Sequence, residues 1–248
     1  MSAIYIMWMR QLKRYWRSRG RVIGSLGQPI LFLVALGFGF SGIYAKAGGG
    51  DYMQFLAPGV ISMAILFTSM FSGMEVIWDR QFGFLKETLV APVSRWTIMM
   101  GKTLGGATIA LIQALIVFII TLLIGFRPVS LFSLLIAFVF MFLIGFMFTA
   151  MGVAIACKLE DMQAFPLIMN FLIMPIFFLS GALFPLGGLP KVIEWITIIN
   201  PLTYGVDGVR GALTGVSSYA LTTDFGIIIV FAAIMMSIGT YLFSGVEA

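Results

Sequence analysis

Three consecutive residues of this chain, Gly101, Lys102 and Thr103, match the end of a phosphate-binding loop. A complete loop also needs a glycine five residues before Gly101, where this chain has Trp96, and a preceding β-strand. The surrounding stretch is long and apolar, which predicts a helix instead. We therefore expect no nucleotide site in this segment and no cofactor bound by the chain itself.

Other side chains that perform catalysis or bind metals are scarce. The chain has no histidine and one cysteine, Cys157, so it lacks the commonest general base and cannot form an intrachain disulfide. Glu75 is the one acid that the pattern places inside an apolar stretch. It is either a functional acid within the membrane, where a charge is costly, or a residue at headgroup level shortly before Trp78. The sequence predicts no catalytic residue and no metal site.

The composition requires a lipid environment. Hydrophobic residues make up 60% of the 248 residues, charged residues only 10%, and the mean hydropathy is +1.07. Soluble domains carry roughly 25% charged residues. The net charge of +5 does not indicate nucleic acid, because the basic residues gather at the ends of apolar stretches, beside lipid headgroups. We predict an all-α integral membrane protein that contacts lipid and binds no nucleic acid.

Six apolar stretches are long enough to cross a bilayer, which takes about 20 helical residues. The predicted spans are 22–44, 55–78, 96–126, 131–157, 165–183 and 225–245. Together they form one transmembrane domain over residues 1–248. Glycines four apart, such as Gly101 and Gly105, favour close helix packing, although 28 glycines also produce such pairs by chance.

The distribution of basic residues sets the expected orientation. Eleven of the 15 Lys and Arg residues precede the first span or lie between spans two and three or four and five, and the other four lie on the opposite side. Membrane-flanking segments rich in Lys and Arg stay in the cytoplasm. Both termini are therefore expected to be cytoplasmic, in a multi-pass protein of the cell membrane.

Residues 184–200 do not fit a full span. The segment is apolar, but it is interrupted by Pro185 and Pro190 and carries Glu194. Residues 190–199 would form a helix of about 15 Å, half a bilayer, that ends at Asn200-Pro201. This pattern predicts a re-entrant or interfacial hairpin on the outer side, which is either a gate over a pathway or a tightly packed outer loop.

The first 21 residues have the pattern of an amphipathic helix. Ile4, Trp8, Leu12 and Tyr15 share one helical face, and basic residues occupy another. Such a helix lies in the headgroup plane, and an ordinary basic anchor for the first span is compatible with the same pattern.

Residues 79–95, between spans two and three, hold a second amphipathic pattern. One face is formed by Trp78, Phe82, Leu85 and Leu89. The opposite face mixes acids and bases between Asp79 and Glu87, so span two is expected to continue as a helix until it breaks near Ala91-Pro92. Mixed charge favours docking to a partner protein over a helix that lies flat on the lipid.

Two groups of residues together resemble the type-two permeases of ATP-binding-cassette (ABC) exporters. The first is Tyr52-Met53-Gln54-Phe55-Leu56-Ala57-Pro58-Gly59, followed by Glu87-Thr88-Leu89-Val90-Ala91-Pro92-Val93-Ser94-Arg95 and Gly101-Lys102. The second is Ser180-Gly181-Ala182-Leu183-Phe184-Pro185, Leu189-Pro190, Asn200-Pro201-Leu202-Thr203-Tyr204 and Asp207-Gly208-Val209-Arg210. The resemblance covers essentially the whole chain and is strongest to the drug- and antibiotic-resistance permeases.

This resemblance implies partners and site residues. Such permeases pair as two copies around a central pathway, and each copy binds a separate ABC ATPase that uses ATP and Mg²⁺. The resemblance assigns the ATPase contact to the N-terminal amphipathic helix and to the helix after span two, with Asp79, Arg80, Phe82, Phe84, Leu85, Lys86 and Glu87. It assigns the outer gate to the hairpin, with Phe184, Pro185, Pro190, Glu194, Asn200 and Pro201.

The resemblance thus predicts a transport subunit of an ATP-driven exporter and leaves its cargo open. A drug, an antibiotic or a lipid-like amphiphile fits the subgroup, and a lipid-linked polysaccharide is the alternative within the family. From other classes, a channel or scaffold and a membrane-embedded enzyme are the alternatives. The enzyme would need His, Asp or Glu side chains gathered at one depth, which this sequence lacks.

Overall fold

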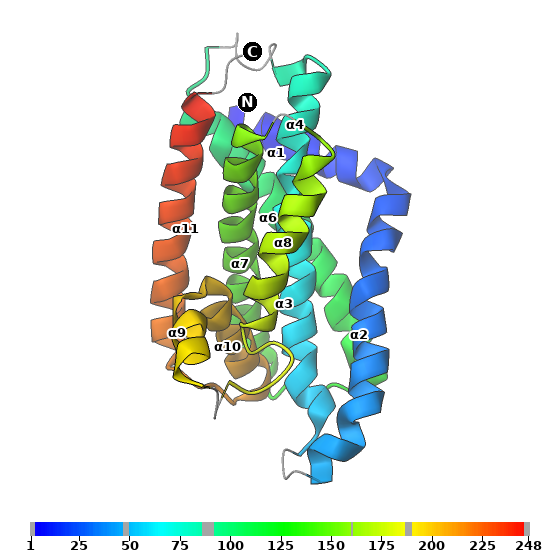
Figure 1. Ribbon diagram of the computed structural model, residues 1–248. Coiled ribbons are helices and arrows are strands. Elements are labelled where there is room, and N and C mark those ends of the chain that lie inside the picture. Colours follow the sequence, from blue (N-terminus) through cyan, green and yellow to red (C-terminus); the bar gives the residue numbers. More distant parts are fainter. Residues whose placement is uncertain (1–2, 47–49, 86–91, 160, 187–189, 246–248) are drawn as a thin grey trace.

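The computed structural model describes residues 3–46, 50–85, 92–159, 161–186 and 190–245, and within these ranges the regular secondary structure is helical. The helices are α1 (Ala3–Arg17), α2 (Arg19–Lys46), α3 (Tyr52–Ser72), α4 (Met74–Gln81), α6 (Arg95–Ile124), α7 (Leu131–Lys158), α8 (Ala164–Phe178), α9 (Lys191–Ile199), α10 (Pro201–Thr214) and α11 (Leu221–Ser244). They form an elongated bundle in which α1 and the end of α11 lie at one end (Figure 1). We call this the terminal end and the opposite one the distal end.

Five helical segments in the described ranges are long and apolar enough to cross a membrane. They are Val22–Tyr44, Tyr52–Gln81, Arg95–Ile124, Leu131–Lys158 and Leu221–Ser244. Each coincides with a predicted span, within a few residues at its ends. The all-α class predicted from the sequence is therefore confirmed for the described part of the chain.

The helix observed in the predicted span 165–183 is shorter than the prediction. α8 ends at Phe178 after 15 residues, which is about 22 Å and less than the ~30 Å of a hydrocarbon core. Pro175 lies in its last turn, and Gly181 has a left-handed backbone with a φ of 73°. The chain turns over residues 179–183 for this reason, and a sixth crossing stays a prediction.

The predicted span 55–78 is interrupted near its end. α3 stops at Ser72 and α4 starts at Met74, with Gly73 between them. A Cβ atom on Gly73 would clash with the backbone of Gly152 on α7, so two glycines let these segments touch backbone to backbone. The segment Tyr52–Gln81, which holds α3 and α4, is the most buried of the five long segments, with 72% of its apolar window buried in the bundle.

Two glycines of α6 form a groove that receives α1. A Cβ atom on Gly105 would clash with the side chain of Gln11, and one on Gly101 would lie 2.8 Å from Cβ of Met7. Gly101 and Gly105 therefore have the packing role that their spacing suggested. The amphipathic helix predicted in residues 1–21 is present over Ala3–Arg17.

Hydrogen bonds from two amphipathic aromatic side chains add to this contact. Nε1 of Trp8 donates to Oγ1 of Thr108 at 3.0 Å, and the Tyr15 hydroxyl donates to Oε1 of Gln113 at 2.7 Å. The predicted apolar face of α1 is thus directed at α6. α1 is part of the bundle and not a separate anchor.

The first turns of α2 stand away from the other helices. A Cβ atom added to Gly20, Gly24 or Gly27 would meet nothing within 4 Å. Further along, a Cβ atom on Gly37 would lie 2.5 Å from Cε of Met53 on α3. α2 and α3 are therefore in contact at Gly37 and separate toward the terminal end.

Two short helices, α9 and α10, form a hairpin at the distal end (Figure 1). Asn200 joins them: its Oδ1 accepts from the backbone N–H of Leu202 at 3.0 Å, and its Nδ2 donates to the Ile176 carbonyl of α8 at 2.7 Å. Pro201 occupies the first turn of α10. Proline has no backbone N–H, and this costs nothing here because N–H groups in the first turn of a helix have no intrahelical partner. The predicted helix before Asn200 is observed, whereas α10 has no counterpart among the predicted elements.

Candidate functional site

At the terminal end, one buried carboxylate joins three helices. Asp79, on α4, is 2% exposed. Its Oδ2 accepts hydrogen bonds from Nη2 of Arg10 on α1 at 2.5 Å and from Nζ of Lys102 on α6 at 2.6 Å. Nη1 of Arg14, also on α1, lies 3.5 Å from the other oxygen. A buried charge is costly unless it is paired, so this carboxylate fastens α1, α4 and α6 to one another.

The next residue, Arg80, fastens α4 to a fourth helix. Its two terminal nitrogens donate to the carbonyls of Leu159 and Cys157, at 3.2 Å and 3.1 Å. The last carbonyls of a helix lack intrahelical partners and favour a nearby cation. Arg80 therefore caps the end of α7. We call Asp79, Arg80 and their side-chain and backbone partners the terminal clamp.

The residues that resemble a phosphate-binding loop belong to this region. All three lie inside α6 and not in a loop. Gly101 receives α1, Lys102 pairs with Asp79, and Thr103 is buried with its hydroxyl 3.8 Å from the sulfur of Met236 on α11. Helix packing and charge pairing account for each of them.

The structure divides the predicted ATPase-contact residues into inward and outward groups. Asp79 and Arg80 are engaged in the terminal clamp, whereas Phe82 and Phe84 are 68% and 52% exposed. Lys86 and Glu87 lie outside the described residues. Among the predicted contact residues that the structure describes, the exposed ones are thus aromatic and not charged.

The single apolar face predicted from Trp78 to Leu89 is wrong where the structure describes it. α4 ends at Gln81, and Gly83 takes a left-handed backbone with a φ of 78°, which interrupts the helical phase. Phe82 is therefore exposed while Leu85 is 1% exposed. A sequence pattern cannot show this, because a glycine inside a helical pattern is often tolerated.

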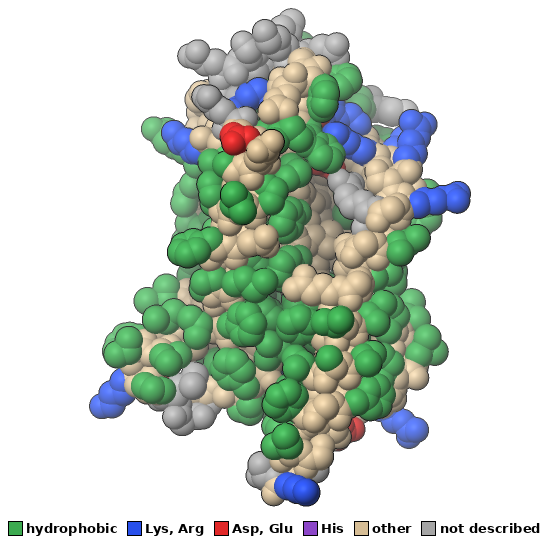
Figure 2. All heavy atoms as spheres, turned by 45° about the vertical axis from the view of Figure 1, so that its right-hand side comes forward, with side chains coloured by type: hydrophobic (Ala, Val, Ile, Leu, Met, Phe, Trp, Pro, Cys, Tyr) green, Lys and Arg blue, Asp and Glu red, His purple; other side chains and the backbone are tan. Residues whose placement is uncertain are grey.

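Next to the terminal clamp, a cleft opens between α2 and the α3–α4 segment. Its lining comes from Tyr15 of α1, from residues between Met63 and Trp78 of α3–α4, from Ile109 of α6, and from four residues of α2, Gly24, Ser25, Gln28 and Pro29. The hollow appears between α2 and the body of the bundle in Figure 2. Its volume is about 430 Å³, within the range of roughly 300–1,000 Å³ that small-molecule sites occupy.

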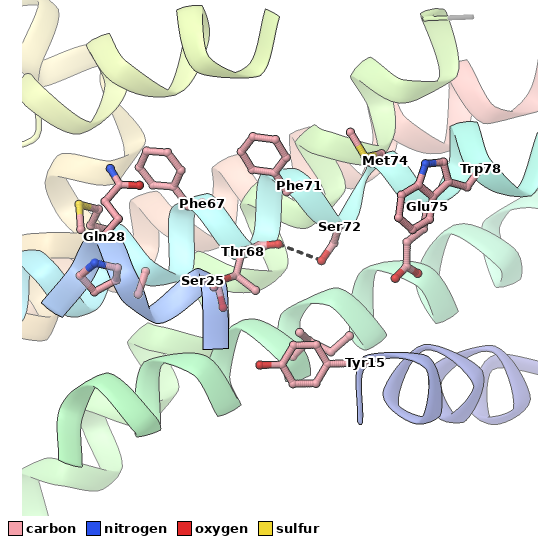
Figure 3. Close-up of a pocket in the computed structure, with 15 residues that line it drawn as sticks. Tyr15, Ser25, Gln28, Phe67, Thr68, Phe71, Ser72, Met74, Glu75 and Trp78 are labelled. Carbon is pink, nitrogen blue, oxygen red and sulfur yellow. Dashed lines mark hydrogen bonds between the residues drawn. The ribbon is translucent and has the colours of Figure 1, made fainter. Parts of the chain in front are cut away.

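Glu75 lines this cleft. It is 4% exposed and lies one helical turn before Asp79 on α4. Figure 3 shows its carboxylate on the same side of the α3–α4 segment as Thr68 and Ser72. The one acid that the sequence placed inside an apolar stretch therefore lies between the cleft and the terminal clamp.

The hairpin residues predicted to form an outer gate are mostly at the surface. Phe184, Pro185, Pro190 and Glu194 are exposed, Pro201 is half-buried and Asn200 is buried. The second helix of the hairpin, α10, lies well inside the bundle. A Cβ atom on Gly205 of α10 would lie 2.8 Å from Ile144, about 20 Å along α7 from its distal end.

Two charged residues of α10 hold this hairpin in place, and sequence reasoning gave them no role. Nη2 of Arg210 donates to the Gly181 carbonyl at 2.8 Å, and its guanidinium carbon lies 4.1 Å from the centre of the Phe55 ring. Asp207 accepts from the backbone N–H groups of Ser218 and Tyr219 in the turn before α11. The sequence signals were their charges within a largely apolar segment and their place among the residues that carry the family resemblance. Neither signal shows what they bind, because their partners are backbone groups.

Comparison with known proteins gives the family. The chain matches the ABC-2 type transporter family over residues 2–214. It is similar to the putative transport permease ycf38 of Porphyra purpurea, with 30% identity over 211 residues, 81% of this chain and 70% of that protein. It is also similar to the inner membrane transport permease YadH of Escherichia coli (strain K12), with 25% identity over 234 residues, 92% of this chain and 90% of that protein.

A further relative is nodulation protein J of Rhizobium leguminosarum bv. viciae, with 23% identity over 223 residues, 89% of this chain and 85% of that protein. The chain belongs to the ABC-2 type transporter family. It is a multi-pass membrane protein and the permease subunit of an ABC transporter. The family resemblance found in the sequence is thereby confirmed.

Proposed function

We propose that two copies of this chain form the pathway of an exporter in the cell membrane, with both termini in the cytoplasm and a separate ABC ATPase bound to each copy. The proposed cargo is a drug, an antibiotic or a lipid-like amphiphile. The observation that carries the proposal is the terminal clamp. It holds exposed Phe82 and Phe84 next to α4, which is tied to three other helices at once, α1, α6 and α7.

In this proposal, the aromatic residues after α4 are the ATPase contact, and the clamp transmits its movement. When ATP binding brings the two ATPases together, a displacement of Phe82 and Phe84 acts on α4. Asp79 and Arg80 transmit this displacement to α1, α6 and α7. It also reaches α3, because α3 and α4 adjoin at Gly73. Because α3 and α4 form one wall of the cleft, the same displacement changes the cleft. Such domain movements take microseconds to milliseconds.

At the distal end, we assign the hairpin of α9 and α10 as a re-entrant gate on the outer side, with α8 as the fifth of six crossings. The depth of Gly205 along α7 and the bond from Asn200 to α8 support this assignment. Backbone that is broken within a membrane must be covered by protein, and the break at Asn200 is bonded to α8 while α10 packs against α7 and α11.

Reconstitution tests the proposed function directly. The chain is coexpressed with its ABC ATPase, purified through a tag on the permease, and placed in liposomes that contain a fluorescent single-chain amphiphile. We expect transbilayer movement of the amphiphile that requires ATP and stops when the ATPase carries an inactivating substitution. Movement at the same rate without ATP would instead indicate a passive channel.

A further inference from the structure

At the distal end, one buried carboxyl group has no partner. Asp224 lies in the first turn of α11 and is 0% exposed. Neither of its oxygens accepts a hydrogen bond or belongs to an ion pair within the described part of the chain. Buried polar groups are nearly always hydrogen-bonded, so this exception needs an explanation. An ionisable side chain in a membrane-spanning segment is a functional candidate by default.

A second buried acid at the same joint is fully paired. Both oxygens of Asp207 on α10 accept a hydrogen bond from the backbone N–H of Ser218, at 2.9 Å and 2.8 Å, and one also accepts from Tyr219 at 2.8 Å. These bonds stabilise the charge of Asp207. The same charge acts on Asp224 and disfavours a second negative charge there.

The packing of α10 and α11 encloses Asp224. The start of α11 lies beside α10 at the distal end (Figure 1). A Cβ atom on Gly211 of α10 would lie 2.9 Å from Cδ2 of Leu221, and Asp224 follows Leu221 by one helical turn on the same face. Phe140 of α7 packs edge-on against Phe225, with ring centres 6.1 Å apart. The Asp224 carboxyl is therefore shut in where α10 meets α11.

No cation in the described part of the chain is paired with Asp224. Among the helices that pack against α11, α7 has one basic residue, Lys158, and α6 has Arg95 and Lys102, all toward the terminal end. α10 has Arg210, which binds a backbone carbonyl elsewhere. An ionised Asp224 would thus be a buried charge without a partner, which is costly, and a helix N-terminus offsets only a small part of that cost.

The groups around Asp224 favour a proton over a metal ion. A calcium or magnesium ion takes about six or more oxygen ligands. The described residues contain no group of three or more acids, cysteines or histidines that could hold a metal ion. The remaining titratable groups that face this joint are Tyr204, whose hydroxyl donates to the Ile198 carbonyl at 2.8 Å, and Tyr219, whose ring lies 5.3 Å from that of Tyr204. A proton needs only the one carboxyl group.

We propose that Asp224 is a proton-binding site and that its bound proton keeps α10 and α11 together. A neutral carboxyl group is far less costly to bury than a charged one. When Asp224 loses its proton, the charge must reach water, which requires α10 and α11 to separate. The proton site itself follows from the burial of Asp224, whereas any part that it has in an outer gate rests on the proposed function.

Infrared spectroscopy of the permease alone tests whether Asp224 holds a proton. A protonated carboxylic acid has a C=O stretching band that a carboxylate lacks, and dodecyl maltoside is a detergent without carbonyl groups. At mildly acidic pH we expect this band in the difference between the wild type and Asp224→Asn. Glu194→Gln, at an exposed acid of the same end, should give a carboxylate difference instead. A carboxylate difference for D224N as well would overturn the proposal.

Two isosteric variants show whether the proton holds the joint. Asp224→Asn keeps the shape of the neutral acid, whereas Asp207→Asn removes a charge that has hydrogen-bond partners. We expect protection from hydrogen exchange over residues 201–214 to be unchanged or higher in D224N and about tenfold lower in D207N. An equal loss in both variants would show that the fold uses the charge of Asp224, which contradicts a bound proton.

The pH dependence of this protection has a defined sign. The closed joint binds the proton more tightly than an opened joint in which Asp224 meets water, so protection is highest at low pH and falls as the proton is lost. After correction for the intrinsic exchange rate, we expect this fall in the wild type and in E194Q and none in D224N. A fall that persists in D224N, or protection that rises with pH, would rule out Asp224 as the proton site.

None of these measurements contains the ATPase, so they are independent of the proposed function. A protonated Asp224 in a permease that shows no ATP-driven movement of the amphiphile would reject the exporter and keep the proton site. ATP-driven movement with an ionised Asp224 would reject the proton site and keep the exporter.

Discussion

The two ends of this permease are fastened by different kinds of bond. At the terminal end, side-chain charges from separate helices meet at Asp79, and Arg80 joins them to α7. At the distal end, Asn200, Asp207 and Arg210 bind backbone carbonyls and amides. The terminal end is therefore a network of several helices around one carboxylate. The distal end is held by separate hydrogen bonds that share no common side chain.

This difference indicates how each end can move. Removal of the Asp79 carboxylate would leave cations on two helices without their partner, so α1, α4 and α6 are expected to move together. The side-chain bonds of the distal hairpin involve neighbouring segments and none of them reaches α1, α4 or α6, so loss of one is expected to leave the terminal end unchanged. Transmission of movement suits the first arrangement, and gating suits the second.

The largest effect is expected for Asp79→Ala. Removing one partner of a buried ion pair costs about 3–5 kcal/mol, because the other charge remains buried. Here Lys102 is buried and would lose its 2.6 Å contact. Thermal unfolding of the purified protein in detergent should show a clear loss of stability. Glu194→Ala, at an exposed acid of the distal end, is the control and should change stability little.

A double substitution sharpens this test. In Asp79→Ala with Lys102→Met, the buried cation is removed as well, so part of the lost stability should return. If the two single effects simply add, Asp79 and Lys102 are not coupled, and the network at the terminal end is not the unit described above.

A smaller and local effect is expected for Arg210→Ala at the distal end. A hydrogen bond from a charged group contributes about 1.5–3 kcal/mol, and the Gly181 carbonyl would lose this donor. Hydrogen exchange should become faster over residues 191–214 and remain unchanged in α1 and α4. Faster exchange at both ends would show that the two ends are not independent.

The seating of α1 is tested by Gly105→Ala. A Cβ atom at this position clashes with Gln11, and overpacking of this kind costs about 1–3 kcal/mol. We expect faster hydrogen exchange in α1. Gly27→Ala, at an open glycine of α2, should leave exchange in α1 unchanged. Unchanged exchange in both variants would show that α1 is not held by the α6 groove.

The long helices could be predicted from the sequence, because an uninterrupted apolar run of about 20 residues matches the thickness of a bilayer and little else in a protein. The end of α9 at Asn200-Pro201 was also predictable, since a proline restricts the residue before it. The helix α10 was not predictable from the sequence. Its polar and small residues give no sign that it is buried, because the burial comes from contacts with helices that are distant in the chain. The inward direction of the Asp79 side chain could not be predicted, because its partners are far away in the chain. The change of helical phase at Gly83 could not be predicted either, because it depends on one backbone angle.

Copurification of the ABC ATPase with Phe82→Asp/Phe84→Asp tests most directly whether the clamped segment is the ATPase contact. Both side chains are exposed, so stability should change by no more than about 0.5 kcal/mol for each substitution. Tyr241→Asp, at an exposed aromatic near the end of α11, is the matched control. We expect the ATPase to be lost from the double variant and retained by Y241D. A double variant that is folded and still copurifies with its ATPase at the wild-type ratio would contradict the assignment.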